Sequence, residues 1–325
     1  MKCTNKKRRT IIICLFLICI FFLGGCSKPQ ETTITEYESE YYNKSLYHGK
    51  LFAKDLCTVS ENVTLDGFTN DDTLFAAGLF DVKNEKVLYA WKVHERIYPA
   101  STTKLLTAYV TLKYGNLDDI VTVGPGALEF EQEAQLCGLQ EGDQLTLYDL
   151  LCGLLLYSGN DCAVAIAEYL SGSVEAFCGI MNQEAWEMGA TQTHFVNPHG
   201  LHDTQHYTTA YDLYLIFNEC IKDRRFLDII SLTGYTASIT GADGSVRTAE
   251  WIPTNFYSAG LVEMPEGINV IGGKTGTTDE AGACVILFSK DMEENPYISI
   301  IMGAADKPLL YQKMTELLLS GVAFN

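Results

Sequence analysis

The order of hydrophobic patterns along the chain sets the strongest limit on its fold. Two β-prone runs at residues 74–80 and 87–91 flank a turn-like segment at 83–85, which predicts a hairpin. A long helical pattern follows over 147–189, and strand-like runs dominate only after Tyr235. Because helices separate the early strands from the late ones, we predict an α+β domain. In it, an antiparallel sheet completed by the N-terminal hairpin is flanked by helices, with an inserted helical region.

Local signals place further elements within this order. Pro99 precedes a helix that closes at Gly115. The long helical block is interrupted at residues 158–160 and again at Gly172, where Ser173 has the character of an N-cap. The other predicted elements are a helix over 208–221, strands at 270–271, 283–288 and 297–302, and a terminal helix over 307–319. We expect one cleft at the boundary between sheet and helices.

Composition and charge exclude some classes of function. The chain has 325 residues, with 47% hydrophobic and 20% charged residues, which is enough apolar material for a substantial core. The formal net charge is -18. Such a surface repels phosphate groups, so we expect no nucleic acid partner. An anionic substrate therefore needs a local positive site.

The N-terminus has the pattern of a targeting segment. A basic stretch at residues 6–9 precedes an apolar run at 11–23, which is too short to span a bilayer. The run ends in Gly24-Gly25-Cys26, which resembles a bacterial lipoprotein signal and implies cleavage before Cys26 and lipidation of its thiol. A plain secretory signal and a short anchor helix are the alternatives. Each of the three places the rest of the chain outside the cytoplasm.

These features divide the chain into three predicted parts. Residues 1–25 form the lipoprotein signal peptide, and 26–50 a polar, acidic tether without helical or strand periodicity. Residues 51–325 form the catalytic domain. The lipid on Cys26 would hold the protein at the membrane.

Cysteine usage argues against a metal centre. No CxxC spacing or Cys/His cluster is present, so we predict no metal ligands. Seven cysteines follow Cys26, and an odd number cannot all pair. We expect mostly buried free thiols and leave open one disulfide without an assignment. The seven are Cys57, Cys137, Cys152, Cys162, Cys178, Cys220 and Cys284.

Three short motifs stand in order along the chain. They are an S-x-x-K at residues 101–104, an S-x-N at 158–160 and a K-T-G at 274–276. Each alone is weakly specific, because a short motif recurs by chance. The ordered set is much more specific, because each motif falls at the edge of a predicted element. Serine acyltransferases combine these three motifs.

The first motif has the residues that nucleophilic catalysis needs. Ser101 follows Pro99 in the first helical turn, where unpaired N–H groups and the helix dipole favour an oxyanion. Lys104 lies three residues on, so both side chains share one helix face. A serine hydroxyl is a weak nucleophile without a base, and Lys104 can act as a base only when neutral. Burial and the charge of Lys274 would both lower the pKa of Lys104.

The other two motifs supply proton transfer and substrate binding. Ser158 could relay a proton to the leaving amine, while Asn160 positions the substrate amide. Lys274 supplies positive charge, and Thr275 and Thr277 could hold a carboxylate. Glycines before and within this motif, among them Gly276, allow a substrate backbone to approach an edge strand.

The segments around the motifs resemble the low-molecular-mass penicillin-binding proteins that are serine D-alanyl-D-alanine carboxypeptidases. The resemblance is carried by residues 150–161, 197–201, 206–213 and 273–282, and the similarity extends from about Phe75 to Gly321. It implies the penicillin-binding/β-lactamase-like transpeptidase fold. It also implies peptidoglycan stem peptides as substrates, β-lactams as inhibitors and no cofactor.

The same resemblance assigns roles to individual residues. The catalytic positions are Ser101, Lys104, Ser158, Asn160 and Lys274. Substrate-binding residues are Lys274, Thr275, Gly276 and Thr277, and the backbone N–H groups of Ser101 and Thr277 form the oxyanion hole. One departure concerns the substrate carboxylate. No arginine follows residues 302–304, where family members use one, and Lys307 or Lys313 is the candidate replacement.

Other functions compete with this interpretation. A class A β-lactamase shares the motifs but needs a carboxylate that activates water, and residues 193–201 contain none. A metal-dependent peptidase could use the cluster His194, His199, His202, Asp203 and His206, but its spacing is typical of loop histidines that bond backbone groups. A D,D-endopeptidase acting on cross-links would use the same chemistry. A non-catalytic peptidoglycan-binding lipoprotein would keep the cleft without turnover.

Overall fold

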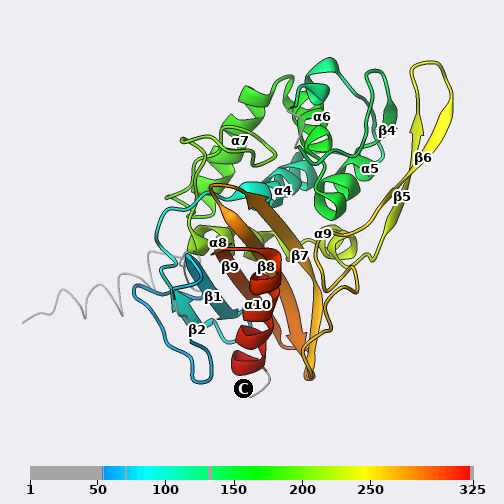
Figure 1. Ribbon diagram of the computed structural model, residues 1–325. Helices are drawn as coiled ribbons and strands as arrows, with labels where there is room; N and C mark the ends of the chain where they lie inside the picture. Colours follow the sequence, from blue (N-terminus) through cyan, green and yellow to red (C-terminus); the bar gives the residue numbers. More distant parts are fainter. Residues whose placement is uncertain (1–52, 54, 70–71, 131–133, 323–325) are drawn as a thin grey trace, which may run out of the picture. The chain divides into compact units, whose positions relative to one another are not determined.

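A five-stranded antiparallel sheet forms the centre of the fold (Figure 1). Its strand order is β2-β1-β9-β8-β7, so the N-terminal hairpin pairs with the last strand and β7 lies at an edge. The prediction that this hairpin completes the sheet of the C-terminal strands is confirmed. The strands are β1 (Ala76–Asp81), β2 (Lys86–Trp91), β7 (Ile268–Thr278), β8 (Gly282–Asp291) and β9 (Pro296–Ala304).

The protein is represented by a computed structural model that describes residues 53, 55–69, 72–130 and 134–322. The predicted signal peptide, Cys26 and nearly all of the predicted tether lie outside these residues. The compact unit to which the described fold belongs is Asp55–Asn325.

Both faces of the central sheet are covered, which explains the unbroken apolar sequence of its inner strands. In β1 all six residues are buried. Ala77 and Leu79 contribute to a core shared with α10 (Lys307–Gly321), whereas Ala76 and Phe80 contribute to the core of the helical side. This alternation is the two-residue period of a strand. The α+β class predicted from the sequence is therefore confirmed.

The helices form the inserted region and the layer behind the sheet (Figure 1). Helix α8 packs on β1 and β9, and α4 packs on α6, α7 and α8. The helices are α4 (Lys104–Tyr114), α5 (Leu147–Cys152), α6 (Asn160–Ser171), α7 (Val174–Glu187), α8 (Ala210–Cys220) and α9 (Arg224–Ile230). Short 3-10 segments cover Ala100–Thr103 and Pro125–Leu128, and a π-helical turn covers Gly153–Tyr157.

A second, smaller sheet edges the helical region and was not predicted as such. Its order is β3-β4-β5-β6, with β3 and β4 only three residues long. Strands that short carry too few residues to show a period. The sheet consists of β3 (Ile120–Thr122), β4 (Gln144–Thr146), β5 (Tyr235–Thr240) and β6 (Val246–Trp251).

Several local predictions for the helical block are confirmed. Ser173 caps α7 by accepting a hydrogen bond from the Ala176 N–H at 3.1 Å, and Gly115 ends α4. Helix α9 had not been predicted, because its seven residues are too few to show a helical period. Among the described helices, none is by itself long and apolar enough to cross a membrane; α6 and α7 reach that length only together, across an 87° bend.

Close backbone approach brings β7 against the 3-10 turn at Ala100–Thr103. A Cβ on Gly276 would lie 2.8 Å from the Ser101 nitrogen, and one on Gly272 would lie 2.0 Å from the Ile230 carbonyl oxygen of α9. Neither contact leaves room for a side chain. The glycines of this strand therefore set how closely the sheet meets the helical region, where the three motifs converge.

Candidate active site

Ser101 lies on a strained 3-10 turn rather than in the first turn of an α-helix. The turn spans Ala100–Thr103 and leads directly into α4. Ala100 has a φ of 47°, which is unfavourable for a residue with a Cβ. Its carbonyl accepts a hydrogen bond from the Thr103 hydroxyl at 2.8 Å. Gly200 packs so closely on that carbonyl that a Cβ would lie 1.8 Å from the oxygen.

Lys104 is fully buried and joins three segments of the chain. Its Nζ donates to Ser101 Oγ at 3.0 Å, to Asn160 Oδ1 at 2.6 Å and to the His199 carbonyl at 2.7 Å. Burial lowers the pKa of Lys104 to about 7, against the opposing influence of Cys137, Cys162 and Asp161. A substantial fraction of this amine is therefore neutral near pH 7, as a base for Ser101 requires.

The second motif reverses the chain between the π-helical turn and α6. Ser158 adopts a left-handed conformation with φ 68° and ψ 31°, which ends the turn and allows a new helix to start at Asn160. Its hydroxyl accepts a hydrogen bond from Lys274 Nζ at 2.9 Å. The Asn160 N–H donates to the Gln135 carbonyl at 2.8 Å. Ser158 therefore contacts Lys274, whereas the Asn160 side chain contacts Lys104.

The third motif lies on the edge strand β7, beside Ser101. Lys274 is buried, and its Nζ also donates to the carbonyl of Thr275 at 2.9 Å. Burial, and then the charges of Lys104 and Lys307, hold the pKa of Lys274 well below its ordinary value. The Thr275 hydroxyl lies 2.7 Å from that of Thr254. The sequence predicted that the charge of Lys274 lowers the pKa of Lys104. Instead, the charge of Lys104 lowers the pKa of Lys274, and burial is the first cause of the lowered pKa of both lysines.

Thr277 is exposed on the same edge of β7, past Gly276. Among the described strands, β7 has a neighbour, β8, on one side only. Its outer edge is therefore free of strand pairing along the motif, beside the turn that carries Ser101. An extended peptide could add there as a further strand, which is the mode of binding predicted from the glycines in and before the K-T-G motif.

Three of the loop histidines, His194, His199 and His206, contact backbone groups. His199 Nδ1 accepts from the Leu201 N–H at 3.1 Å, and His194 Nδ1 lies 2.7 Å from the Gln205 carbonyl. Burial lowers the pKa values of His199 and His206 to about 3, so both rings are neutral. In the described part of the chain, the group of side chains close enough to share a metal ion is Cys137, Asp161 and Cys162, without any histidine.

His206 has a supporting role that the sequence did not reveal. Its Nδ1 accepts from the Val196 N–H at 3.1 Å, so the ring proton is on Nε2, which lies 2.8 Å from the Thr103 hydroxyl. That hydroxyl in turn donates to the carbonyl of Ala100. The chain of bonds holds the strained turn in place. No sequence signal marks it, because the partners are 103 residues apart.

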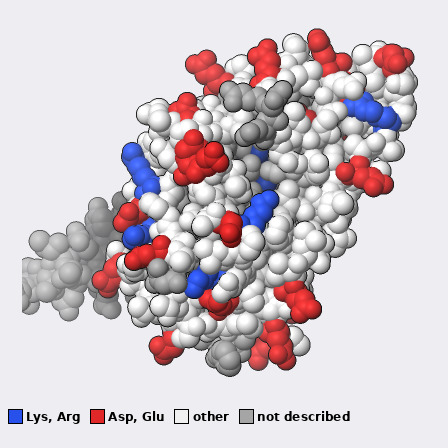
Figure 2. All heavy atoms as spheres, viewed as in Figure 1, with Lys and Arg blue, Asp and Glu red and all other residues white. Residues whose placement is uncertain are grey.

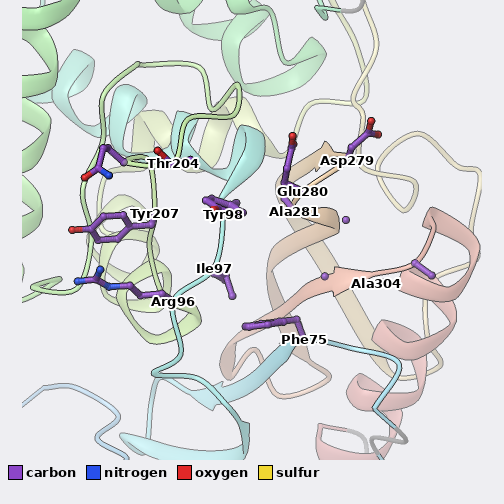
Figure 3. A pocket seen from close by; sticks show the side chains of 14 residues that line it. Phe75, Arg96, Ile97, Tyr98, Thr204, Tyr207, Asp279, Glu280, Ala281 and Ala304 are labelled. Carbon is purple, nitrogen blue, oxygen red and sulfur yellow. The ribbon is translucent and has the colours of Figure 1, made fainter.

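A cavity of about 600 Å³ opens next to the end of β7 (Figure 3). Tyr98 lines one wall, three residues before Ser101, and Phe75 lies across from it. Asp279 and Glu280 lie at the turn between β7 and β8. The side chains of the three motifs are not among its lining residues, so the cavity adjoins the predicted catalytic groups and does not contain them.

Acidic side chains dominate the charge on the face shown in Figure 2, where Asp and Glu are spread over most of the outline and Lys and Arg are fewer. The two motif lysines are both buried below this surface, and burial lowers the pKa of each. Lys307 adds an exposed positive charge close enough to affect Lys274. Lys307 is thus an exposed positive charge near the third motif in a chain of net charge -18.

Comparisons with known proteins agree with this geometry. Residues 73–306 match the family described as D-alanyl-D-alanine carboxypeptidase. The D-alanyl-D-alanine carboxypeptidase DacA of Haemophilus influenzae is 33% identical over 69% of this chain, and DacF of Bacillus subtilis is 30% identical over 75%. The matches cover 56% and 60% of these relatives, so the chain spans little more than half of their length.

Solved structures give the same result for the fold. The Streptomyces K15 DD-transpeptidase superposes with a TM-score of 0.73 at 28% identity, covering 81% of this chain and all of that one. A D-alanyl-D-alanine carboxypeptidase from Mycobacterium tuberculosis gives a TM-score of 0.70 at 25% identity, with coverage of 81% and 97%. The predicted penicillin-binding type of fold is confirmed. From the match over most of its described residues, this chain belongs to the D-alanyl-D-alanine carboxypeptidase family.

Proposed function

We propose that this protein is a serine D-alanyl-D-alanine carboxypeptidase that removes the terminal D-alanine from peptidoglycan stem pentapeptides. The observation that carries the proposal is the set of hydrogen bonds from Lys104 Nζ to Ser101 Oγ and Asn160 Oδ1. Burying an amine costs free energy relative to an apolar side chain, and a buried amine with a pKa of about 7 is suited to proton abstraction.

The first half-reaction acylates Ser101. Neutral Lys104 takes the hydroxyl proton while Ser101 Oγ attacks the carbonyl carbon of the penultimate D-alanine. The N–H groups of Ser101 and Thr277 stabilise the negative oxygen that forms. The position of the Ser101 nitrogen against β7 supports this pairing, because the two groups come from adjoining backbone segments.

Release of D-alanine and hydrolysis complete the reaction. The leaving nitrogen takes its proton through Ser158, whose hydroxyl accepts a hydrogen bond from Lys274. The proton that Lys104 took from Ser101 passes on to replace the one given to the leaving amine, so Lys104 is neutral again. Water then attacks the ester on Ser101, Lys104 accepts the proton of that water, and Lys104 returns the proton to Ser101 Oγ as the ester bond breaks. All steps use side chains of the chain itself, so we expect no cofactor. A β-lactam would acylate Ser101 in the same way and act as an inhibitor.

The substrate carboxylate would be held by Thr275, Thr277 and Lys307. Lys307 is exposed at the start of α10, and its charge contributes to the lowered pKa of Lys274. Lys313, the other candidate replacement for the family arginine, lies 3.3 Å from Glu316 and 3.5 Å from the carbonyl of Thr69. The contacts of Lys313 therefore favour Lys307 for this role.

Two related activities share the acyl-enzyme. A D,D-endopeptidase would accept a cross-linked peptide, and a transpeptidase would pass the acyl group to an amine, the activity named for the Streptomyces K15 structure. A non-catalytic binder is disfavoured, because simple binding would not require a buried lysine beside a serine. Product analysis with a pentapeptide, a cross-linked dimer and an added acceptor amine would separate these activities.

The protein is further proposed to act outside the cytoplasm, attached to the membrane by a lipid on Cys26. The support is the basic, apolar and small-residue pattern over residues 6–26. Replacement Cys26→Ala should abolish incorporation of a labelled fatty acid in the producing bacterium and move the protein from the membrane fraction to the soluble one. Cys57→Ala is the matched control and should leave both unchanged. Labelling that persists in Cys26→Ala would refute lipidation at this residue.

Replacement of the nucleophile or the base should remove turnover. We expect Ser101→Ala and Lys104→Ala each to lower the rate of D-alanine release from a stem pentapeptide by at least about a thousandfold, because Lys104 is the base that contacts Ser101 among the described residues. Only Ser101→Ala should also abolish covalent labelling by a fluorescent penicillin at any incubation time. Lys113→Ala, on the same helix, is the control. Near-normal turnover in Lys104→Ala would show that another group is the base.

The pH profile of acylation should follow the ionisation of Lys104. Because the neutral amine is the base, the second-order rate of penicillin acylation should fall as pH drops below the pKa of about 7. The fall should approach about tenfold per pH unit, and the rate should level off above pH 8. Stopped-flow labelling between pH 5 and 9 would measure it. A rate independent of pH over this range would contradict a lysine base.

Neutralising Lys307 should weaken substrate binding more than catalysis. For Lys307→Met we expect KM for the pentapeptide to rise about tenfold with kcat nearly unchanged, because a charge-assisted contact to the substrate carboxylate is lost. Lys313→Met should change neither constant by more than about twofold. Equal effects of both replacements would show that the overall electrostatic potential of the surface, and not a specific contact with Lys307, determines binding.

A further inference from the structure

Two cysteine side chains lie together directly beside the Ser158-Gly159-Asn160 turn. The sulfur atoms of Cys137 and Cys162 and a carboxylate oxygen of Asp161 are all within 4.8 Å of one another. A Cβ on Gly159 would lie 2.5 Å from Cys137 Sγ and 3.2 Å from Cys162 Sγ. The missing side chain of this glycine thus leaves the space in which the two sulfur atoms meet.

A second glycine, Gly153, borders the space in which the two sulfur atoms lie. A Cβ on Gly153 would lie 2.7 Å from Cys162 Sγ and 2.9 Å from Cys137 Sγ. Both sulfur atoms therefore lie close to the same two points of the backbone. Cys162 is fully buried, whereas Cys137 retains 8% exposure. Both residues are buried, and Cys137 is the less deeply buried of the two.

The backbone around the pair is already held in place. Asp161 Oδ1 accepts hydrogen bonds from the N–H groups of Cys137 and Cys162, both at 2.9 Å, and Oδ2 accepts from Leu139 at 3.2 Å. The Asn160 N–H binds the carbonyl of Gln135. The segment that carries Cys137 and the first turn of α6 are therefore fixed relative to each other, with the sulfur atoms facing.

A metal ion is a poorer occupant of this place than a covalent bond. Both Asp161 oxygens are engaged by backbone N–H groups, so ligation would compete with bonds that hold the loop. Structural zinc sites need four ligands, and this group offers three. A disulfide needs only the two sulfur atoms and leaves the Asp161 contacts intact.

We propose that Cys137 and Cys162 form a reversible disulfide, which clamps the segment that carries Cys137, before β4, to helix α6. The oxidant is an organic disulfide, small or protein-borne. The Cys137 thiolate attacks it, forming a mixed disulfide and releasing one thiolate. The Cys162 thiolate then attacks Cys137 Sγ, closing the bond and releasing the second thiolate. The two protons of the cysteine thiols end on the two released thiolates, so the cysteines are oxidised and the organic disulfide is reduced to two thiols.

The bond would act on the active site through Asn160. Asn160 lies between Cys137 and Cys162 in the sequence, and its Oδ1 accepts the hydrogen bond from Lys104 Nζ. A bond between residues 137 and 162 closes the chain between them into a loop, which reduces the entropy of the unfolded chain. Oxidation should therefore stabilise the domain. The inference does not depend on the proposed peptidase activity, because bond formation is measured directly.

The test uses the full chain, equilibrated in mixtures of oxidised and reduced glutathione, trapped with acid and maleimide, and mapped by mass spectrometry after digestion. We expect a cross-linked peptide that joins Cys137 to Cys162 and lacks two hydrogens. The melting temperature of the oxidised protein should rise by about 5 °C or more. Reduction with dithiothreitol should reverse both changes.

Matched variants identify the pair. Cys137→Ala should lose the cross-link and the rise in melting temperature, while Cys178→Ala, which removes a buried thiol from α7, should keep both. The proposal is overturned if the wild-type chain yields only glutathione adducts or separately labelled Cys137 and Cys162 under the most oxidising mixture. Because the wild-type map decides this alone, a variant that fails to fold would not obscure the result.

Discussion

The fold around the active site depends on the burial of one lysine. Lys104 Nζ has its hydrogen bonds satisfied by three acceptors from separate parts of the chain: Ser101, Asn160 and the carbonyl of His199. Burying an amine without partners is strongly unfavourable, so these three segments must meet for the helix to pack. The same burial that makes the contacts necessary also lowers the pKa of Lys104 to about 7. Structural and chemical requirements thus coincide in one side chain.

The backbone accepts local strain to bring the segments together. Ala100 and Ser158 both adopt left-handed conformations without being glycine, one before the nucleophile and one within the second motif. Tertiary contacts compensate for this cost. The Thr103 hydroxyl holds the Ala100 carbonyl, and Gly200 packs directly on it. Strain that surrounding contacts maintain is common at sites where side chains must be positioned accurately.

The acidic surface and the buried lysines form a consistent electrostatic design. A net charge of -18 would repel an anionic peptide, yet Lys104 and Lys274 lie below the surface and Lys307 is exposed beside them. The charge of Lys104 also contributes to the lowered pKa of Lys274. Neutral Lys104 and a locally positive binding surface can therefore exist together.

The sequence by itself determined the motifs, their order and the α+β class, because local periodicity and residue type are enough for these. It also predicted that the hairpin at residues 74–91 joins the late strands. The second sheet, α9 and the 3-10 turn at Ala100 were decided by tertiary contacts, since short or strained segments have no period of their own. So were the carbonyl of His199 on Lys104, the bond from His206 to Thr103, and the meeting of Cys137 with Cys162. These depend on distances between residues far apart in the chain, which only packing can fix.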